Sequence, residues 1–235
     1  MFFCKHRLVR WITLAGALWL AFGASAADQS PEAVFQRMDQ AAAKFKGLTA
    51  DMKRVAHEGA IDEEDVSTGS IKVRLPKPHD LRMLLDFNPP DAKQVEISGS
   101  KVLIYYPKSN TAQQYDFGRS HRAQMEQFLK LGFGSTSREM QEAYQVEIGG
   151  PEKIEGQDTT RLVLTPKSPE LAAQFPKFEL WISDATGIAI QQKMYQPGKS
   201  YNLITYTHMR INPNLSDADV KLKLPPGVKP ELLQR

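Results

Sequence analysis

The spacing of apolar residues changes from a helical to a strand-like period near residue 47. Val34, Met38 and Phe45 recur at helical intervals, which places them on one face of a helix. Ser30, followed by proline and glutamate, is a favourable N-cap, and Gly47 is suited to the position after a helix. The pattern predicts an amphipathic helix between Ser30 and Gly47.

Beyond residue 47, apolar and polar side chains alternate, as in strands with one buried face. Turn-forming stretches such as Asn88-Pro89-Pro90-Asp91 and Pro197-Gly198-Lys199 separate the alternating runs. Neighbouring parallel strands need a crossover of a dozen or more residues, so these closely spaced strands must be antiparallel. The predicted strands span residues 48–57, 66–75, 80–87, 93–98, 101–106, 111–117, 145–149, 159–165, 177–183, 188–196 and 201–211.

A helical stretch separates the two runs of strands. Its first segment begins near Ser120, and two glycines end it at 132 and 134. Thr136 and Glu139 form a capping box for a second short helix, and a third helix begins at Ser168. The apolar residues predicted to cover the sheet from these helices and the N-terminal one are Val34, Met38, Phe45, Met125, Phe128, Leu129 and Met140.

These elements predict a mainly β protein with helices, of the α+β class. A single sheet of about eleven strands must curl. The apolar faces of the helices must be buried, and the concave side of the sheet is where they can pack. We therefore expect an unclosed, strongly curled antiparallel β-barrel with an α-helical lid or plug over a hydrophobic cavity. No repeat, linker or low-complexity tract interrupts residues 27–235, which predicts a single domain.

The first 26 residues have the features of an export signal. Three basic residues within the first ten precede a twelve-residue apolar run at 11–22, which is too short to span a membrane. Ala24-Ser25-Ala26 supplies the small residues that signal peptidases require. We expect cleavage between Ala26 and Ala27, and a periplasmic location for the mature chain.

Cysteine usage refines this expectation. Cys4 is the only cysteine, and it lies ahead of the apolar run. The mature chain can therefore form no disulfide and no thiolate metal site. A bacterial lipoprotein needs a cysteine directly after the apolar run, where this chain has Ala27. We expect a diffusible protein without a lipid anchor.

The charge of the chain gives no sign of a nucleic-acid partner. The formal net charge is +3, and the first 26 residues contain Lys5, Arg7 and Arg10 but no acid. The remainder is formally neutral and offers no electrostatic steering toward phosphate.

No motif for catalysis or cofactor binding stands out. The sequence lacks a G-x-S-x-G elbow and metal-binding histidine spacings, and the acidic run Asp62-Glu63-Glu64-Asp65 is typical of a solvated hairpin tip. Gly132-Phe133-Gly134-Ser135 lacks the Lys-Ser/Thr ending of a phosphate loop. We expect no metal, no cofactor and no enzymatic activity.

The most informative feature is an excess of apolar residues on one face of the sheet. They form either an ordinary packed core or the wall of a cavity for a hydrophobic ligand, since short glycine-broken helices fill a curled sheet poorly. Methionines suit a pocket for variable acyl chains. The predicted cavity residues are Leu75, Leu81, Met83, Leu85, Phe87, Val95, Ile97, Ile104, Leu162, Leu164, Leu203, Met209 and Ile211.

Several short motifs, in order, resemble those of the periplasmic lipoprotein carrier family LolA. The resemblance covers nearly the whole chain after residue 26. Each motif is weakly specific, and their order together with the export signal carries the resemblance. The matching segments are residues 48–52 after the N-terminal helix, the strand 69–76 ending in proline, residues 95–107, residues 162–167, and the C-terminal segments 212–215 and 224–228.

The resemblance implies an unclosed barrel under a three-helix lid. It also implies a soluble carrier that takes acylated lipoproteins from an inner-membrane lipoprotein-releasing ABC transporter and passes them to an outer-membrane lipoprotein receptor. We expect a monomer. The alternative is a periplasmic module of the same fold that binds lipid or glycolipid, or senses lipoproteins, without transferring them. A lipid-modifying hydrolase is a third possibility.

The chain departs from the family at one position. Family members have an arginine directly before the strand-ending proline, where it holds the lid closed, and this chain has Leu75 there. Arg74 is the neighbouring residue, and strand alternation points it to the opposite face. The resemblance therefore transfers no arginine latch to this chain.

Overall fold

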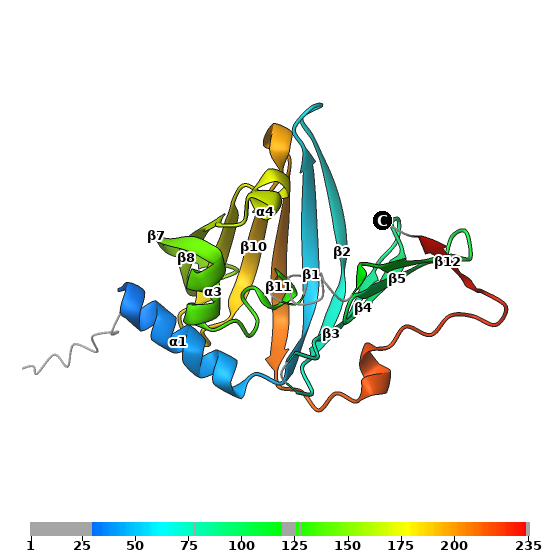
Figure 1. The fold of residues 1–235 in the computed structure, drawn as a ribbon, viewed down its shortest axis with the longest axis horizontal. Helices are drawn as coiled ribbons and strands as arrows, with labels where there is room; N and C mark the ends of the chain where they lie inside the picture. Colours follow the sequence, from blue (N-terminus) through cyan, green and yellow to red (C-terminus); the bar gives the residue numbers. More distant parts are fainter. Residues whose placement is uncertain (1–29, 78, 119–125, 127, 234–235) are drawn as a thin grey trace, which may run out of the picture.

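The computed structural model describes residues 30–77, 79–118, 126 and 128–233, and these form one large sheet with helices packed on it (Figure 1). The strand order is β12-β6-β5-β4-β3-β2-β1-β11-β10-β9-β8-β7. The strands are β1 (Gly47–Glu58), β2 (Glu63–Arg74), β3 (Arg82–Phe87), β4 (Lys93–Ser98), β5 (Lys101–Tyr106), β6 (Thr111–Asp116), β7 (Tyr144–Ile154), β8 (Gln157–Pro166), β9 (Phe178–Ser183), β10 (Ala189–Tyr195), β11 (Tyr201–Ile211) and β12 (Pro230–Leu233).

Two antiparallel meanders, β1 to β6 and β7 to β11, are joined side by side by the pairing of β1 with β11. The expectation of about eleven strands, all antiparallel, needs one correction. A twelfth strand, β12, pairs in parallel with β6 at the edge of the sheet. The chain between β11 and β12 is long enough to make the crossover that a parallel pair requires.

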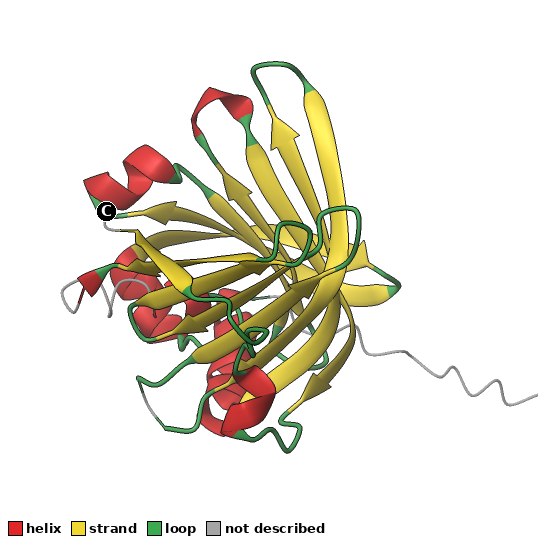
Figure 2. Cartoon of the chain, turned by 90° about the vertical axis from the view of Figure 1, so that its right-hand side faces the viewer, coloured by secondary structure: helices red, strands yellow, loops and turns green. Residues whose placement is uncertain are grey.

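The sheet is strongly curled and remains open between its edge strands β7 and β12 (Figure 2). Helix α1 (Pro31–Lys44) crosses one open end of the curl, next to α3 (Ser137–Ala143) (Figure 1). The predicted caps are confirmed, because Ser30 accepts a hydrogen bond from the Ala33 amide and Thr136 forms a capping box with Glu139. The remaining short helices are α4 (Pro169–Gln174), η1 (Pro197–Lys199) and η2 (Asp217–Val220).

The segment after β11 packs on the outer, convex side of the sheet. Arg74 donates to the Leu215 carbonyl at 2.8 Å and pairs with Asp217, and Arg82 pairs with the same carboxylate at 2.9 Å. Arg74 therefore lies on the face opposite to the cavity, as strand alternation predicted. Leu75 packs instead against the concave core.

The core lies on the concave side in two adjoining groups. One group packs the inner faces of β1 to β3 against Phe45 and Phe133, and the other packs the inner faces of β8 to β10 against α1 and α3. The expected α+β class and concave core are confirmed. In the described part of the chain, no helix is long and apolar enough to cross a membrane. The predicted export signal lies outside the described residues.

An irregularity in β11 changes which of its side chains face inward. Thr207 pairs with Asp51 and Arg210 pairs with Thr49, so the strand holds one extra residue between these pairs. His208, with a positive φ of 48°, lies in this bulge. Before it, even-numbered residues such as Tyr206 face inward, and beyond it Met209 and Ile211 do.

Candidate functional site: an apolar cavity in the curled sheet

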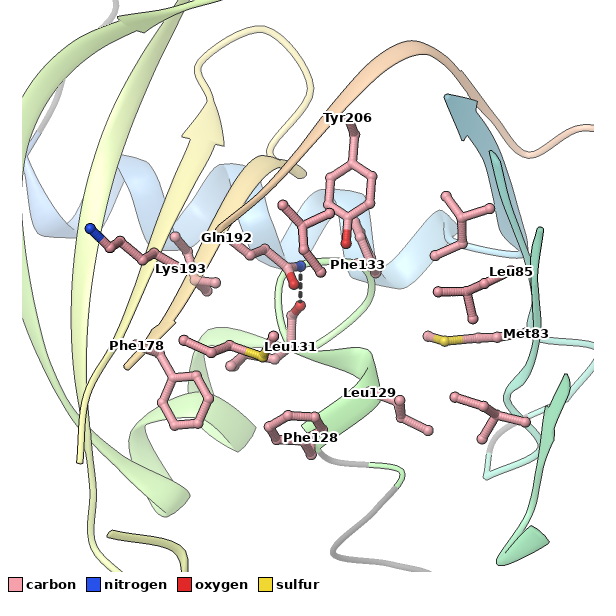
Figure 3. Close-up of a pocket in the computed structure, with 15 residues that line it drawn as sticks. Met83, Leu85, Phe128, Leu129, Leu131, Phe133, Phe178, Gln192, Lys193 and Tyr206 are labelled. Atoms are coloured by element: carbon pink, nitrogen blue, oxygen red, sulfur yellow. Dashed lines mark hydrogen bonds between the residues drawn. The ribbon is translucent and has the colours of Figure 1, made fainter. Parts of the chain in front are cut away.

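A cavity of about 110 Å³ lies between the concave face of the sheet and the segment that covers it (Figure 3). Its walls are almost wholly hydrocarbon. The lining residues are Ile71, Met83, Leu85, Ile97, Phe128, Leu129, Leu131, Phe133, Phe178, Leu180, Gln192, Lys193, Met194, Ile204 and Tyr206.

Strand register brings the wall residues together. On one side Ile71 lies directly opposite Leu85, and Met83 lies opposite Ile97, so four aliphatic side chains share one face of β2, β3 and β4. On the other side Gln192 of β10 lies directly opposite Leu180 of β9 and Ile204 of β11. These three side chains therefore share the inner face of their strands. The curl of the sheet makes these two walls face each other.

Helical residues 128–130 and the turn after them cover the cavity. Phe128 contacts Phe175 and Phe178, with ring centroids 5.6 and 5.9 Å apart. Phe133 meets Tyr206 edge to face at 5.0 Å, which inserts the turn into the core. The covering segment is thus attached mainly by apolar contacts.

Two hydrogen bonds fix the backbone of the same segment. The Gln192 side-chain amide donates to the Leu131 carbonyl at 2.9 Å, shown as a dashed line in Figure 3. The Ala189 amide donates to the Gly132 carbonyl at 2.9 Å. The turn is therefore tied to β10, the strand that carries Gln192 and Met194.

Tyr206 places a phenol in this apolar site. Its hydroxyl points into the cavity in Figure 3, and the side chain is 3% exposed. No described residue is a hydrogen-bond partner of this hydroxyl. Burial raises the pKa of Tyr206 far above that of a free tyrosine, so the phenol is neutral at physiological pH. The Lys193 side chain leaves β10 on the outer face, where its ammonium lies over the Tyr201 ring at 3.7 Å, so it brings no charge into the cavity.

Two polar contacts tie α1 to its surroundings. The Asp39 carboxylate accepts hydrogen bonds from the Ser137 amide and hydroxyl at 2.6 and 2.7 Å, which joins α1 to the start of α3. Arg37 donates to Asp184 at 3.1 Å, and Asp184 is nearly buried.

The structure brings most of the predicted site residues to the concave core. Met83, Leu85, Ile97, Phe128 and Leu129 line the cavity itself. The others in the core, packed around the cavity without lining it, are Leu75, Leu81, Phe87, Val95, Met209 and Phe45 in one group and Val34, Met38, Met140, Leu162 and Leu164 in the other.

Three predicted cavity residues are not part of either core group. Leu203 pairs with Val55 on the convex face, so its placement with Met209 and Ile211 is wrong, because the bulge at His208 reverses the alternation. Ile211 is 38% exposed at the end of β11, and Ile104 is half-buried on β5. Met125 lies outside the described residues.

Sequence reasoning missed much of the second wall. Ile204 and Tyr206 are absent from the predicted cavity residues, because regular alternation through β11 would place Leu203 on the same face as Met209 and Ile211. Phe178 and Leu180 belong to β9, whose six residues are all buried, so this strand shows no alternation that would identify its inner face. Within the described residues, no group of three or more His, Cys, Asp or Glu side chains could hold a metal ion.

No protein-family model and no curated protein matches the chain. An uncharacterised conserved protein from Thermus thermophilus superposes with a TM-score of 0.52 at 16% identity, covering 88% of this chain and 100% of that one. MucB superposes with a TM-score of 0.51 at 13% identity, covering 85% of this chain and 64% of MucB. A LolA superfamily protein from Nitrosomonas europaea gives 0.39 at 11% identity, covering 81% and 97%.

At these low identities the Thermus thermophilus protein and MucB show a shared fold alone. The resemblance predicted from the sequence motifs is confirmed as a likeness of fold. The superposed part of this chain covers 64% of MucB, which is less than two thirds of its length.

Proposed function

We propose that this LolA-like chain is a soluble periplasmic carrier, which binds the acyl chains of lipoproteins in its apolar cavity. In this proposal it receives them from an inner-membrane ABC transporter and delivers them to an outer-membrane receptor. The observation that supports the proposal is the hydrocarbon-lined cavity between two facing walls of the curled sheet, under a covering segment attached mainly by apolar contacts.

The cavity volume is too small for an acyl chain. A cavity of about 150 Å³ holds no more than a molecule such as benzene, and this one is about 110 Å³. An acyl chain can therefore enter only if the covering residues move outward. Phe128 and Leu129, which are half-buried, line the cavity from this segment and are the side chains that a ligand would displace.

A simple estimate shows that such an exchange is feasible. Exposing two large apolar side chains costs roughly 3–6 kcal/mol, and each methylene that enters the cavity contributes about 0.8 kcal/mol. Roughly four to eight buried methylenes therefore offset the opening of the cover. Ordinary acyl chains exceed that length, so the binding energy remaining after opening sets how readily an acceptor removes the cargo.

Leu85→Glu tests the cavity assignment. The substitution places a carboxylate in the apolar wall, so binding of a fluorescent fatty acid should fall at least about tenfold, while circular dichroism shows an intact sheet. Leu203→Glu is the matched control. It makes the same change on a half-buried strand leucine of the convex face, and should leave binding within about twofold. Equal binding by both variants and the wild type would contradict the cavity assignment.

A transfer assay separates a carrier from a binding or sensing module. The loaded protein is mixed with an outer-membrane receptor in vesicles, and the acylated cargo is followed. A carrier gives up its cargo only when the receptor is present. Retention in the presence of receptor would favour the sensing alternative, and release of a cleaved product without receptor would indicate a hydrolase.

A further inference from the structure

A second, polar groove lies on the same concave face, beyond one end of the apolar cavity. It has a volume of about 720 Å³. The long β1–β2 hairpin extends past β3 there, and the loops after β3 and β5 complete the walls (Figure 1). The lining residues are Arg54, Asp65, Ser67, Pro90, Asp91, Ala92, Lys93, Tyr106, Lys108 and Ser109.

Strand register shows that the groove continues the cavity. Ile204, which lines the cavity, lies directly opposite Arg54, which lines the groove. On β2, Ser67 lies four residues before Ile71 and therefore on the same face, roughly 13 Å away. A molecule with its tail in the cavity would place its polar end in the groove.

The charges that face the groove favour an anion. Three cations, Arg54, Lys93 and Lys108, oppose two acids, Asp65 and Asp91. Arg54 donates to the Asn202 side chain at 2.9 Å and lies 4.0 Å from Asp65, which leaves other guanidinium N–H groups for a ligand.

Two further features suit an amphipathic ligand. The Lys93 ammonium lies 4.9 Å over the ring of Phe87, at the border between the apolar core and the groove. The Ser67 hydroxyl in the groove wall is buried and has no hydrogen-bond partner among the described residues. An oxygen of a headgroup that reaches this wall would satisfy it.

We propose that the groove binds the anionic headgroup of a lipidic ligand whose acyl chains occupy the apolar cavity. The shared chemistry is a compact anion such as a phosphate ester, held by Arg54, Lys93 and Lys108 next to the apolar wall. This inference rests on the proposed acyl-chain function. It adds a preference for acidic over zwitterionic cargo of equal chain length.

The test compares phosphatidylglycerol and phosphatidylcholine with identical acyl chains, and glycerol 3-phosphate without chains. The wild type should bind phosphatidylglycerol about tenfold more tightly than phosphatidylcholine, and the preference should shrink as salt screens the cations. The double variant Lys93→Gln/Lys108→Gln should lose this preference, because the binding of phosphatidylglycerol should fall further than that of phosphatidylcholine. Glycerol 3-phosphate alone should bind far more weakly than phosphatidylglycerol.

The double variant Lys53→Gln/Lys101→Gln is the control. It removes the same charge from exposed lysines outside both the groove and the cavity, and should keep the preference. Equal binding of both lipids by the wild type overturns the headgroup site but leaves the carrier proposal intact. Failure of both lipids to bind overturns the headgroup site, and it overturns the carrier proposal as well only if the fluorescent fatty acid also fails to bind. Tight binding of glycerol 3-phosphate alone would show a free-anion site and overturn the coupling to acyl chains.

Discussion

Tyr206 shows how one side chain shapes the cavity. Its hydroxyl points into the cavity and is not among the fully buried polar atoms that lack a hydrogen-bond partner. Tyr206→Phe should therefore leave the free energy of unfolding within about 1 kcal/mol of the wild-type value, measured by urea denaturation. The same variant should bind an acyl ester a few-fold more weakly, because the phenol can donate to the ester carbonyl. Unchanged ester binding would show that the hydroxyl does not contact the ligand.

Single residues also set the limit of prediction from sequence. Alternation placed Met83, Leu85 and Ile97 on one face, and all three line the cavity in the structure, because β3 and β4 are regular and one face of them is apolar. It failed at Leu203, because one extra residue at His208 reverses the two faces of β11. A bulge of this kind costs little and leaves no distinctive residue pattern, so the sequence alone could not locate it.

At the scale of elements, the contact between α1 and α3 holds the helices in place over the sheet. Asp39 accepts two short hydrogen bonds from Ser137, and hydrogen bonds to charged groups contribute roughly 1.5–3 kcal/mol. Asp39→Ala should lower the free energy of unfolding by about 2 kcal/mol. It should also speed the uptake of a fluorescent fatty acid, since it loosens the helices that adjoin the cavity.

The control for this prediction is Gln40→Ala, an exposed position on the same helix, which should change stability by less than about 0.5 kcal/mol. If Asp39→Ala and Gln40→Ala behave alike, the α1–α3 contact does not restrain the helices.

The elements themselves were largely predictable. Caps at Ser30, Thr136 and Ser168 and the turn residues between strands are local signals, and they located the helices and eleven strands well. The parallel strand β12 was missed, because its pairing with β6 depends on the path of the preceding segment over the convex face. The three-helix lid implied by the resemblance stays a prediction.

For the whole molecule, buried tyrosines predict how stability responds to alkaline pH. Burial raises the pKa of Tyr144 to about 12, and burial with a hydrogen bond to Glu179 raises the pKa of Tyr195 to about 12. The unfolded chain ionises these phenols near pH 10, before the folded protein does. Their stabilising contribution is therefore complete below pH 10 and lost as the pH rises toward 12.

Urea denaturation at several pH values measures this effect. The midpoint should fall above pH 10, and Tyr144→Phe should make the fall less steep. An unchanged slope in this variant would show that Tyr144 ionises equally in the folded and unfolded states.

The central claim is that the curled sheet encloses acyl chains, and the most direct test is the mass of the protein as cells make it. The protein is purified without detergent from a bacterial periplasm and its intact mass is measured under native conditions. The account predicts about one acylated molecule per wild-type chain, retained by Leu203→Glu and lost by Leu85→Glu. A wild-type protein that carries nothing and takes up no acyl probe would contradict it, and the apolar face would then be an ordinary core.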